Sequence, residues 1–208
     1  MKKGVFITLE GNEGCGKSTQ IKLLCARLEN ERKKVFLTRE PGGTRAGDEI
    51  RKILLDNRNT RLSGITETLL YMASRAQLVK EVIAPKLASK HIVLCDRWLD
   101  ATVAYQGYGA GVDARWIAEL GQKVTAGALP DLTIFIDLPL EVGLDRAMSH
   151  KKADRMELKP LSFHKKVRAG YLAIARREPR RFKRLTVRPE ESQAHVHERV
   201  MELVNRVL

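Results

Sequence analysis

The sequence is poor in cysteine and has no long apolar run. Its three cysteines, Cys15, Cys25 and Cys95, are odd in number, and their spacing fits no metal-binding pattern. We therefore expect reduced thiols, as in proteins of a reducing compartment. No apolar stretch reaches the roughly 18 residues of a membrane-spanning helix. The N-terminal residues also lack the apolar region of a signal peptide. These absences predict a cytoplasmic protein with no membrane partner.

Internal repeats, low-complexity tracts and Gly/Ser-rich linkers are absent too, which favours a single domain over residues 1–208. Hydrophobic residues make up 43% of the 208 residues, too large a share for a disordered chain. A chain of this length and composition can bury a sizeable core.

Aromatic residues are also scarce, at 5%, whereas basic residues are in excess and give a net charge of +13. A basic balance favours anionic partners such as nucleotides, nucleic acids or anionic membranes. Much of the excess lies in residues 151–188. Nucleic-acid surfaces usually interleave basic residues with aromatic ones. We therefore interpret this region as a solvated basic face and expect no specific nucleic-acid partner.

Apolar runs and helical spacings alternate along the chain. Runs typical of buried strands lie at 5–9, 35–37, 92–95, 132–136 and, more weakly, 184–187. Helical spacing occurs at 17–31, 50–54, 69–87 (with a bend expected at Pro85), 117–124 and 196–207. The alternation predicts an α/β fold with a parallel sheet of about five strands, covered by helices on both faces.

In such a sheet, ligands bind beyond the carboxyl ends of the strands. The polar residues that follow the predicted strands should therefore converge at one edge. They are 10–18, Arg39-Glu40, Asp96-Arg97 and Asp137.

The segment Gly11-Asn12-Glu13-Gly14-Cys15-Gly16-Lys17-Ser18 fits the phosphate-loop pattern G-x-x-x-x-G-K-[ST] between a predicted strand and a predicted helix. Its glycines let backbone N–H groups surround phosphate oxygens at the helix N-terminus. In this pattern Lys17 contacts the β- and γ-phosphates, and the Ser18 hydroxyl takes a Mg²⁺ coordination position. The motif predicts a three-layer P-loop NTPase sandwich that binds ATP with Mg²⁺.

A second Mg²⁺ carboxylate is expected at the end of a buried strand. Asp96 is the best candidate, and Asp137 competes on the same pattern. For Asp137 we favour a structural role at a strand end or helix cap, where Asp is common.

A phosphate loop alone does not separate a kinase from a GTPase, a motor or a binding module. The short chain leaves little room for a partner domain, which favours a kinase. Arg39, Arg97 and Arg155 fit a second anionic ligand, such as a nucleoside monophosphate, because phosphoryl transfer depends on charge neutralisation at the moving group.

Five segments in order resemble the thymidylate kinase family over nearly the full chain. They are Gly11 to Thr19, Thr38-Arg39-Glu40-Pro41-Gly42-Gly43-Thr44, Asp96-Arg97-Trp98, Tyr105-Gln106-Gly107 and Asp154-Arg155-Met156-Glu157. The resemblance implies a homodimeric dTMP kinase, a phosphotransferase with a phosphate group as acceptor, acting on ATP and dTMP. It extends the ATP site to Thr19.

The resemblance also implies roles for the acceptor-side residues. Arg39 and Arg97 would grip the acceptor phosphate, with Pro41 and Gln106 nearby. Tyr71 and Arg75 share a helix face because they lie four residues apart. They would meet the thymine ring and its O4 carbonyl. Thr102 would contact the base, Tyr105 would favour deoxyribose, and Glu13 would lie near the acceptor's 3′-hydroxyl.

Residues 145–160, between a helix start at Glu141 and Pro160, would form a lid over ATP that excludes water. The resemblance suggests that Arg146 stacks on the adenine and Arg155 approaches the phosphates. The chain resembles the bacterial style, which has no arginine in the phosphate loop, yet Met148 to Ala153 also lacks the arginine frequent in that style. We hypothesise that Lys151 or Lys152 supplies the charge, without arginine's bidentate geometry.

No general base is expected, because the second pKa of a phosphate monoester, near 6, leaves the attacking oxygen ionised at neutral pH. Two rival interpretations stay open at this point. One is a related kinase with another nucleoside or nucleotide acceptor. The other is a nucleotide-gated module that binds nucleic acid through residues 151–188.

Overall fold

The fold centres on one parallel five-stranded sheet, as the sequence predicted. A computed structural model describes residues 4–150 and 153–208. The strands lie in the order β2-β3-β1-β4-β5. Their bounds are β1 Val5–Glu10, β2 Val35–Arg39, β3 Ile92–Asp96, β4 Leu132–Asp137 and β5 Phe182–Thr186. The register pairs Asp96 with both Leu9 and Arg39, so the carboxyl ends of the three neighbouring strands meet at one edge.

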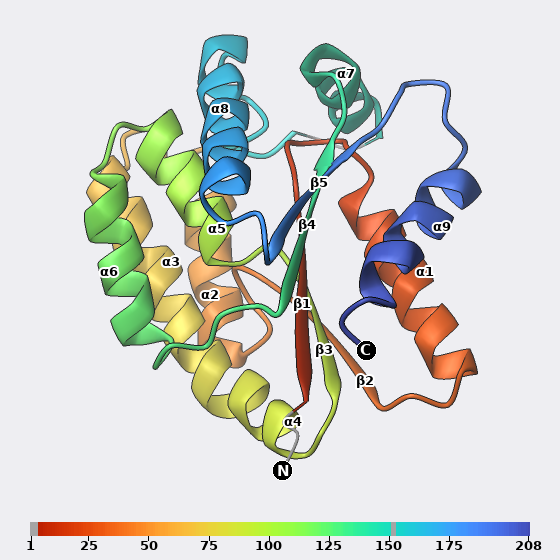
Figure 1. Ribbon diagram of the computed structural model, residues 1–208. Coiled ribbons are helices and arrows are strands. Elements are labelled where there is room, and N and C mark those ends of the chain that lie inside the picture. The colour runs from red at the N-terminus through yellow and green to blue at the C-terminus, as the bar shows by residue number, and fades with distance from the viewer. Residues whose placement is uncertain (1–3, 151–152) are drawn as a thin grey trace.

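Helices cover both faces of the sheet, with α1 and α9 on one side and the other long helices on the opposite side or beyond the strand ends (Figure 1). The α-helices are α1 Lys17–Asn30, α2 Arg45–Leu55, α3 Gly64–Leu78, α4 Ala84–Ala88, α5 Leu99–Thr102, α6 Ala114–Val124, α7 Leu140–His150, α8 Leu161–Arg177 and α9 Gln193–Val204. Two π-helical segments, η1 Val79–Ile83 and η2 Val103–Gly109, join α3 to α4 and follow α5.

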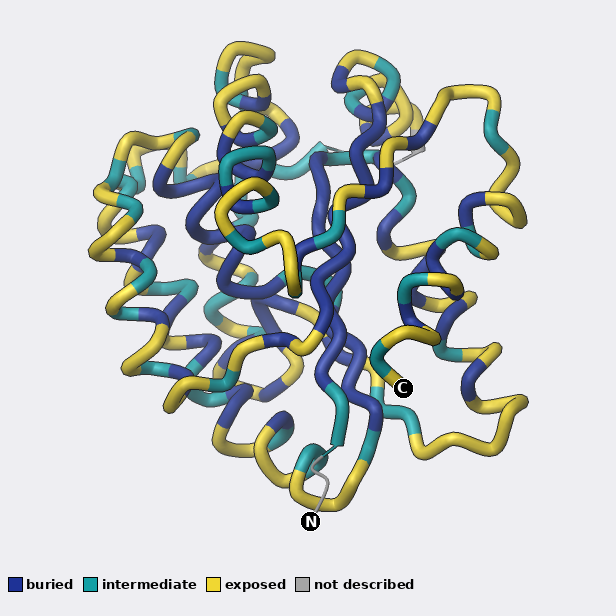
Figure 2. Tube along the Cα trace, in the orientation of Figure 1, coloured by how far each residue is buried: buried dark blue, intermediate teal, exposed yellow. Residues whose placement is uncertain are grey.

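The strands separate two hydrophobic cores, and the central strands of the sheet are dark with buried residues in Figure 2. Successive side chains of a strand point to opposite faces. Phe6 therefore packs with Trp98 and Tyr171 in one core, whereas Ile7 packs with Leu24 and other α1 residues in the second. Burial on both faces explains why the central strands β1, β3 and β4 read as nearly continuous apolar runs.

The predicted helix over 69–87 is interrupted more than a bend at Pro85 would require. Helix α3 ends at Leu78, η1 follows, and α4 has Pro85 in its first turn. Proline has no N–H, and its ring clashes with the carbonyl four residues earlier. The wider π-helical turn directly before it accommodates both effects.

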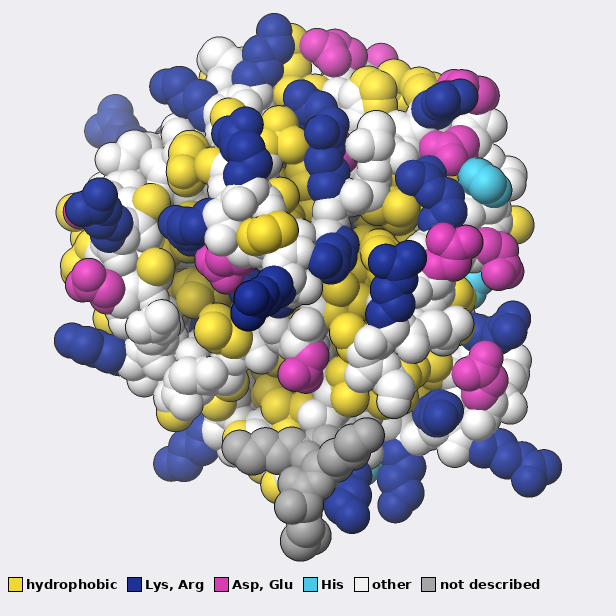
Figure 3. All heavy atoms as spheres, viewed as in Figure 1, with side chains coloured by type: hydrophobic (Ala, Val, Ile, Leu, Met, Phe, Trp, Pro, Cys, Tyr) yellow, Lys and Arg dark blue, Asp and Glu magenta, His cyan; other side chains and the backbone are white. Residues whose placement is uncertain are grey.

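Helix α8, residues 161–177, was not predicted from the sequence. Its buried residues, His164, Val167, Gly170, Tyr171 and Ile174, recur at helical spacing among exposed basic residues. Lys and Arg side chains on this side of the molecule are interspersed with apolar and neutral ones (Figure 3). The interpretation of residues 151–188 as a solvated basic face stays a prediction.

The predicted lid is partly helical. Helix α7 continues to His150, and residues 153–160 form turns that lead into α8, with residues 151–152 outside the described part. The hypothesis about Lys151 and Lys152 falls on those two residues. Strand β5 begins two residues earlier than predicted and ends one residue earlier. Within residues 4–150 and 153–208, no helix is long and apolar enough to cross a membrane.

Candidate active site

A cavity of about 840 Å³ opens at the carboxyl ends of β1, β2 and β3. One part of its wall is the phosphate loop, from Glu13 to Thr19. Another part comes from β2, α3, α5 and η2, and a third from α7, the 153–160 segment and the chain before α9. All eight of the predicted substrate-binding residues line this wall: Arg39, Pro41, Tyr71, Arg75, Arg97, Thr102, Tyr105 and Gln106.

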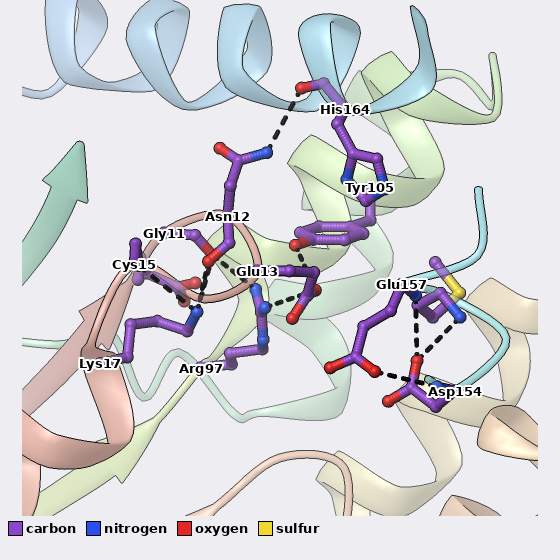
Figure 4. A network of polar contacts seen from close by, with 12 residues as sticks. Gly11, Asn12, Glu13, Cys15, Lys17, Arg97, Tyr105, Asp154, Glu157 and His164 are labelled. Carbon is purple, nitrogen blue, oxygen red and sulfur yellow. Dashed lines mark hydrogen bonds and ion pairs between the residues drawn. The ribbon is translucent and has the colours of Figure 1, made fainter. Parts of the chain in front are cut away.

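The phosphate loop has the backbone that its glycines predict. Gly14 and Gly16 have φ angles of 63° and 93°, a region that residues with a Cβ rarely adopt. Lys17 is buried and curls back over the loop. Its Nζ donates to the carbonyl oxygens of Gly11 at 3.0 Å and Asn12 at 2.8 Å (Figure 4). The ammonium is thereby held inside the loop that the motif assigns to phosphate.

Helix α7 approaches the phosphate loop through two glycines. A Cβ built on Gly14 would lie 1.8 Å from the carbonyl oxygen of Gly143. A Cβ on Gly143 would lie 2.5 Å from the carbonyl oxygen of Glu13. Neither position can carry a side chain without moving the helix away from the loop.

Ser18 and Asp96 meet, as predicted for a Mg²⁺ site. Ser18 Oγ donates to Asp96 Oδ2 at 2.7 Å. A hydroxyl and a carboxylate are hard oxygen donors, which suits Mg²⁺ held mostly by water and phosphate. No cluster of three or more His, Cys, Asp or Glu fit for a metal occurs among the described residues. Asp137 is instead 3% exposed and pairs with Arg168 and Arg184, as expected of a structural residue.

Arg97 lies between β3 and α5 with a left-handed φ of 71°. Its Nη1 donates to the Gly11 carbonyl at 2.9 Å and to Tyr171 Oη at 3.2 Å, and its Nη2 donates to Glu13 at 2.8 Å. Tyr105 also donates to Glu13, at 2.7 Å. Burial raises the pKa of Glu13, but Arg97 and Lys17 outweigh it and lower that pKa to about 2. Glu13 therefore stays ionised beside Arg97.

A buried layer beneath Arg97, which the sequence did not reveal, fixes its backbone. Glu10 accepts hydrogen bonds from the Trp98 backbone N–H at 2.7 Å and from Tyr171 Oη at 2.9 Å. Burial, aided by the charge of Asp100, raises the pKa of Glu10 to about 8. Tyr171 thus connects Glu10 to Arg97, and its only sequence signal is its place on the buried face of α8.

Arg75 is 1% exposed and belongs to an ion pair that the sequence did not predict. Its Nε and Nη2 donate to Glu40 at 2.8 and 2.5 Å, and Nη2 also reaches Thr102 Oγ1 at 3.0 Å. Burial raises the pKa of Glu40 to about 7, although Arg75 opposes the shift. The pair fixes the side of the cavity where Tyr71 also lies.

Arg39 and Arg51 contribute positive charge beside this pair. The side chain of Arg39 is 59% exposed, and within residues 4–150 and 153–208 it makes only a long contact to Asp48, at 3.7 Å, which leaves donors free at the cavity. Arg51 was missed by the sequence analysis. It lines the cavity and donates to the Pro41 carbonyl at 2.9 Å. Burial and the nearby charge of Arg39 lower the pKa of Arg51.

The two arginines expected at the ATP side differ in placement. Arg146 lines the cavity and donates to the Pro189 carbonyl at 3.0 Å, beside Gln193 and Val196. Arg155 is not among the described residues that line the cavity. Its side chain is buried against α2 and α3. The resemblance had instead placed this side chain near the phosphates.

Comparisons with known proteins agree with this geometry. The family model described as thymidylate kinase matches residues 9–200. The chain belongs to the thymidylate kinase family. It is 54% identical to the thymidylate kinase of Geotalea daltonii over 86% of this chain and 87% of that protein. It is 48% identical to that of Trichlorobacter lovleyi, over 95% of this chain and 97% of that protein.

Among solved structures, the crystal structure of thymidylate kinase from Ehrlichia chaffeensis is similar with a TM-score of 0.79 and 34% identity. The match covers 98% of this chain and 99% of that one. The resemblance stated from the motifs and the predicted P-loop fold are both confirmed. Membership of the thymidylate kinase family also makes the chain an ATP-dependent kinase, which disfavours the non-catalytic rival.

Proposed function

We propose that this chain transfers the γ-phosphoryl group of ATP to dTMP, yielding ADP and dTDP for dTTP biosynthesis. One observation carries the proposal: a single cavity joins the phosphate loop to a wall that holds Arg39, Arg97 and Tyr71. Two nucleotides can therefore lie phosphate to phosphate between cationic groups. The family membership of the chain gives the same acceptor.

The transfer needs charge neutralisation rather than proton abstraction. The bond between the γ-phosphorus and the β–γ bridging oxygen breaks as a bond forms to an ionised phosphate oxygen of dTMP. Lys17 and the loop amides hold the donor phosphates, and Arg97 holds the acceptor phosphate. Glu13, ionised and hydrogen-bonded to Tyr105, keeps Arg97 oriented and lies where the acceptor's sugar would be.

Of Arg97's five N–H donors, three are engaged in the hydrogen bonds described above. The Nε hydrogen and one Nη2 hydrogen are not used in these three hydrogen bonds, and we assign them to the acceptor phosphate. Two donors on one planar group match the geometry of a phosphate.

Mg²⁺ belongs to the same proposal, with Ser18 and Asp96 as the residues that would hold it and its water shell. When bound, the ion neutralises charge that develops on the β- and γ-phosphate oxygens. Ser18 places a hydroxyl oxygen and Asp96 a carboxylate oxygen next to the loop, and the hydrogen bond between them orients both side chains.

A panel of acceptors tests the substrate. The wild-type chain, supplied with ATP and Mg²⁺, should release ADP rapidly with dTMP and slowly with dCMP, AMP, GMP or thymidine. Preferred turnover of any of these four over dTMP would instead favour the rival kinase.

A homodimer in the cytoplasm, without a specific nucleic-acid or membrane partner, completes the proposal. Helices α3 and α6 contact each other and carry large exposed apolar side chains. Ile65 is 56% exposed, Leu69 50% and Trp116 38%. A second copy of the chain packed on this surface would bury them. Light scattering coupled to size-exclusion chromatography would measure the mass, and a monomer at micromolar concentration would refute the dimer.

A further inference from the structure

A buried polar cluster joins the 153–160 segment to the acceptor side of the cavity. Its centre is Glu67 on α3, which is 3% exposed. One carboxylate oxygen of Glu67 accepts from Arg155 Nη1, and the other accepts from Gln106 Nε2 at 3.0 Å. Arg155 and Glu67 lie 88 residues apart in sequence. Their contact therefore joins parts of the fold that no local motif connects.

Arg155 is turned away from the phosphates by its own segment. Asp154, Met156 and Glu157 line the cavity, whereas Arg155 between them does not. Its Nε donates to the carbonyl oxygen of Leu54 at 2.8 Å, at the C-terminal end of α2. That end of a helix has free carbonyl groups and partial negative charge, which favours a cation.

The backbone on both sides of Arg155 is fixed to the same region. The Arg155 N–H donates to the Leu55 carbonyl at 3.4 Å, and Asn57 Nδ2 donates to the Ala153 carbonyl at 2.9 Å. The side chains of Arg155 and Glu67 are each 4% exposed. The segment is thus held by a desolvated ion pair together with backbone contacts to the end of α2.

Glu67 also contacts the wall that receives the acceptor. Tyr71 lies one helical turn further along α3, and Gln106 on η2 lines the cavity. A shift of Glu67 would therefore reach Tyr71 through the helix and Gln106 through a hydrogen bond.

We propose that Arg155 and Glu67 form an anchor that couples the position of the 153–160 segment to the acceptor wall, so that Arg155 is a positioning residue. Arg155 does not contact the phosphates in this scheme. To reach them it would have to leave Glu67 as an unpaired buried carboxylate, which is strongly unfavourable. The proposal rests on the proposed function for its kinetic consequences, but the anchor itself is testable without any substrate.

Trypsin cleavage tests the anchor directly, because trypsin cuts after arginine and Arg155 is buried. In the ligand-free protein, Glu67→Gln should speed cleavage of the Arg155–Met156 bond by about tenfold or more, as expected when loss of a buried partner favours local opening. Mass spectrometry would identify the cut. Cleavage after Arg58, whose side chain is 90% exposed, should be unchanged and serves as the internal control. An unchanged rate at Arg155 would overturn the anchor.

A double-mutant cycle separates the anchor from a phosphate contact. With Glu67→Gln and Arg155→Met, the anchor predicts that each single variant raises the KM for dTMP. It also predicts that the double variant is about as impaired as the worse single one, since contacting residues are not additive. A phosphate ligand predicts a fall in kcat from Arg155→Met of the same factor in both backgrounds. That additive result would overturn the proposal.

One control variant and one fallback measurement keep the cycle decisive. Arg58→Met removes an arginine that belongs to an exposed pair with Asp56, close to the same end of α2, and it should leave both kinetic constants unchanged. If Arg155→Met does not fold, Glu67→Gln alone decides, because an unaltered KM for dTMP would refute the coupling. Low turnover of dTMP by the wild-type chain would contradict the proposed function, whereas the trypsin result would still stand.

Discussion

Replacing Arg97 by lysine should slow phosphoryl transfer severely, although the charge is kept. Both residues carry a positive charge and a Cβ, so the left-handed backbone at this position is equally strained in each. Lysine, however, offers one nitrogen where arginine places three hydrogen bonds on Gly11, Tyr171 and Glu13. The variant therefore isolates geometry from charge.

The size of the effect follows from the donors lost. A lysine ammonium can keep one of the three contacts or reach the acceptor phosphate, but not both. Loss of one charge-assisted hydrogen bond in the transition state costs about 1.5–3 kcal/mol. At about 1.4 kcal/mol for each tenfold change in rate, kcat/KM for dTMP should fall about 10- to 150-fold.

A coupled ADP-release assay, with ATP saturating and dTMP varied, measures this effect. The matched control is Arg27→Lys, because Arg27 is an exposed α1 arginine in a pair with Glu31 and should tolerate the change. If the Arg97→Lys variant keeps kcat/KM within about twofold of wild type, Arg97 acts only as a charge, and the reasoning from its fixed donors fails.

Three further outcomes follow from the site. Asp96→Asn should raise the Mg²⁺ concentration for half-maximal turnover by about tenfold, measured by titration, because a neutral amide orders the water shell weakly. Glu10 has a folded pKa of about 8 against 4.5 for the free group, so its contribution to the free energy of unfolding falls as pH rises through that window. In the wild-type chain this loss amounts to up to about 1.4 kcal/mol per pH unit. In Glu10→Gln the free energy of unfolding, measured with urea between pH 5 and 8, should depend less on pH. Gly14→Arg should raise the KM for ATP by about tenfold or more, because its Cβ would clash with Gly143; Gly111→Ala, with a similar φ but no atom within 4 Å, controls for backbone strain.

The phosphate loop and the sheet could be predicted because their signals are local. A contiguous motif fixes the loop, and buried parallel strands leave apolar runs that end where ligands bind. Helix α8 was not predicted because its few buried residues, such as Val167 and Ile174, are separated by lysines and arginines. The basic residues dominate any short window of that sequence, whereas the packing that selects the helix comes from other parts of the fold.

The buried ion pairs could not be predicted for a related reason. Tyr171 lies 161 residues from Glu10, and nothing in either local sequence indicates a partner. Arg155 illustrates the consequence, because a motif places it near the lid but only the fold shows that Glu67 and Leu54 hold it. Sequence patterns therefore predict which residues gather at an edge of the sheet. They do not predict which of those residues face the ligand and which support the wall behind it.

The two glycines between the phosphate loop and α7 restrict where positive charge can enter the site. Because Gly14 and Gly143 lie backbone to backbone, no cationic side chain can project from the middle of the loop toward the transferred group. Cations must come instead from the loop's end, as with Lys17, or from neighbouring elements, as with Arg97 and Arg146. The same contact fixes the start of α7 and hence the position of Arg146 one turn further along. The absence of a cationic side chain in the middle of the loop and the position of Arg146 on the helix thus both follow from a single packing contact.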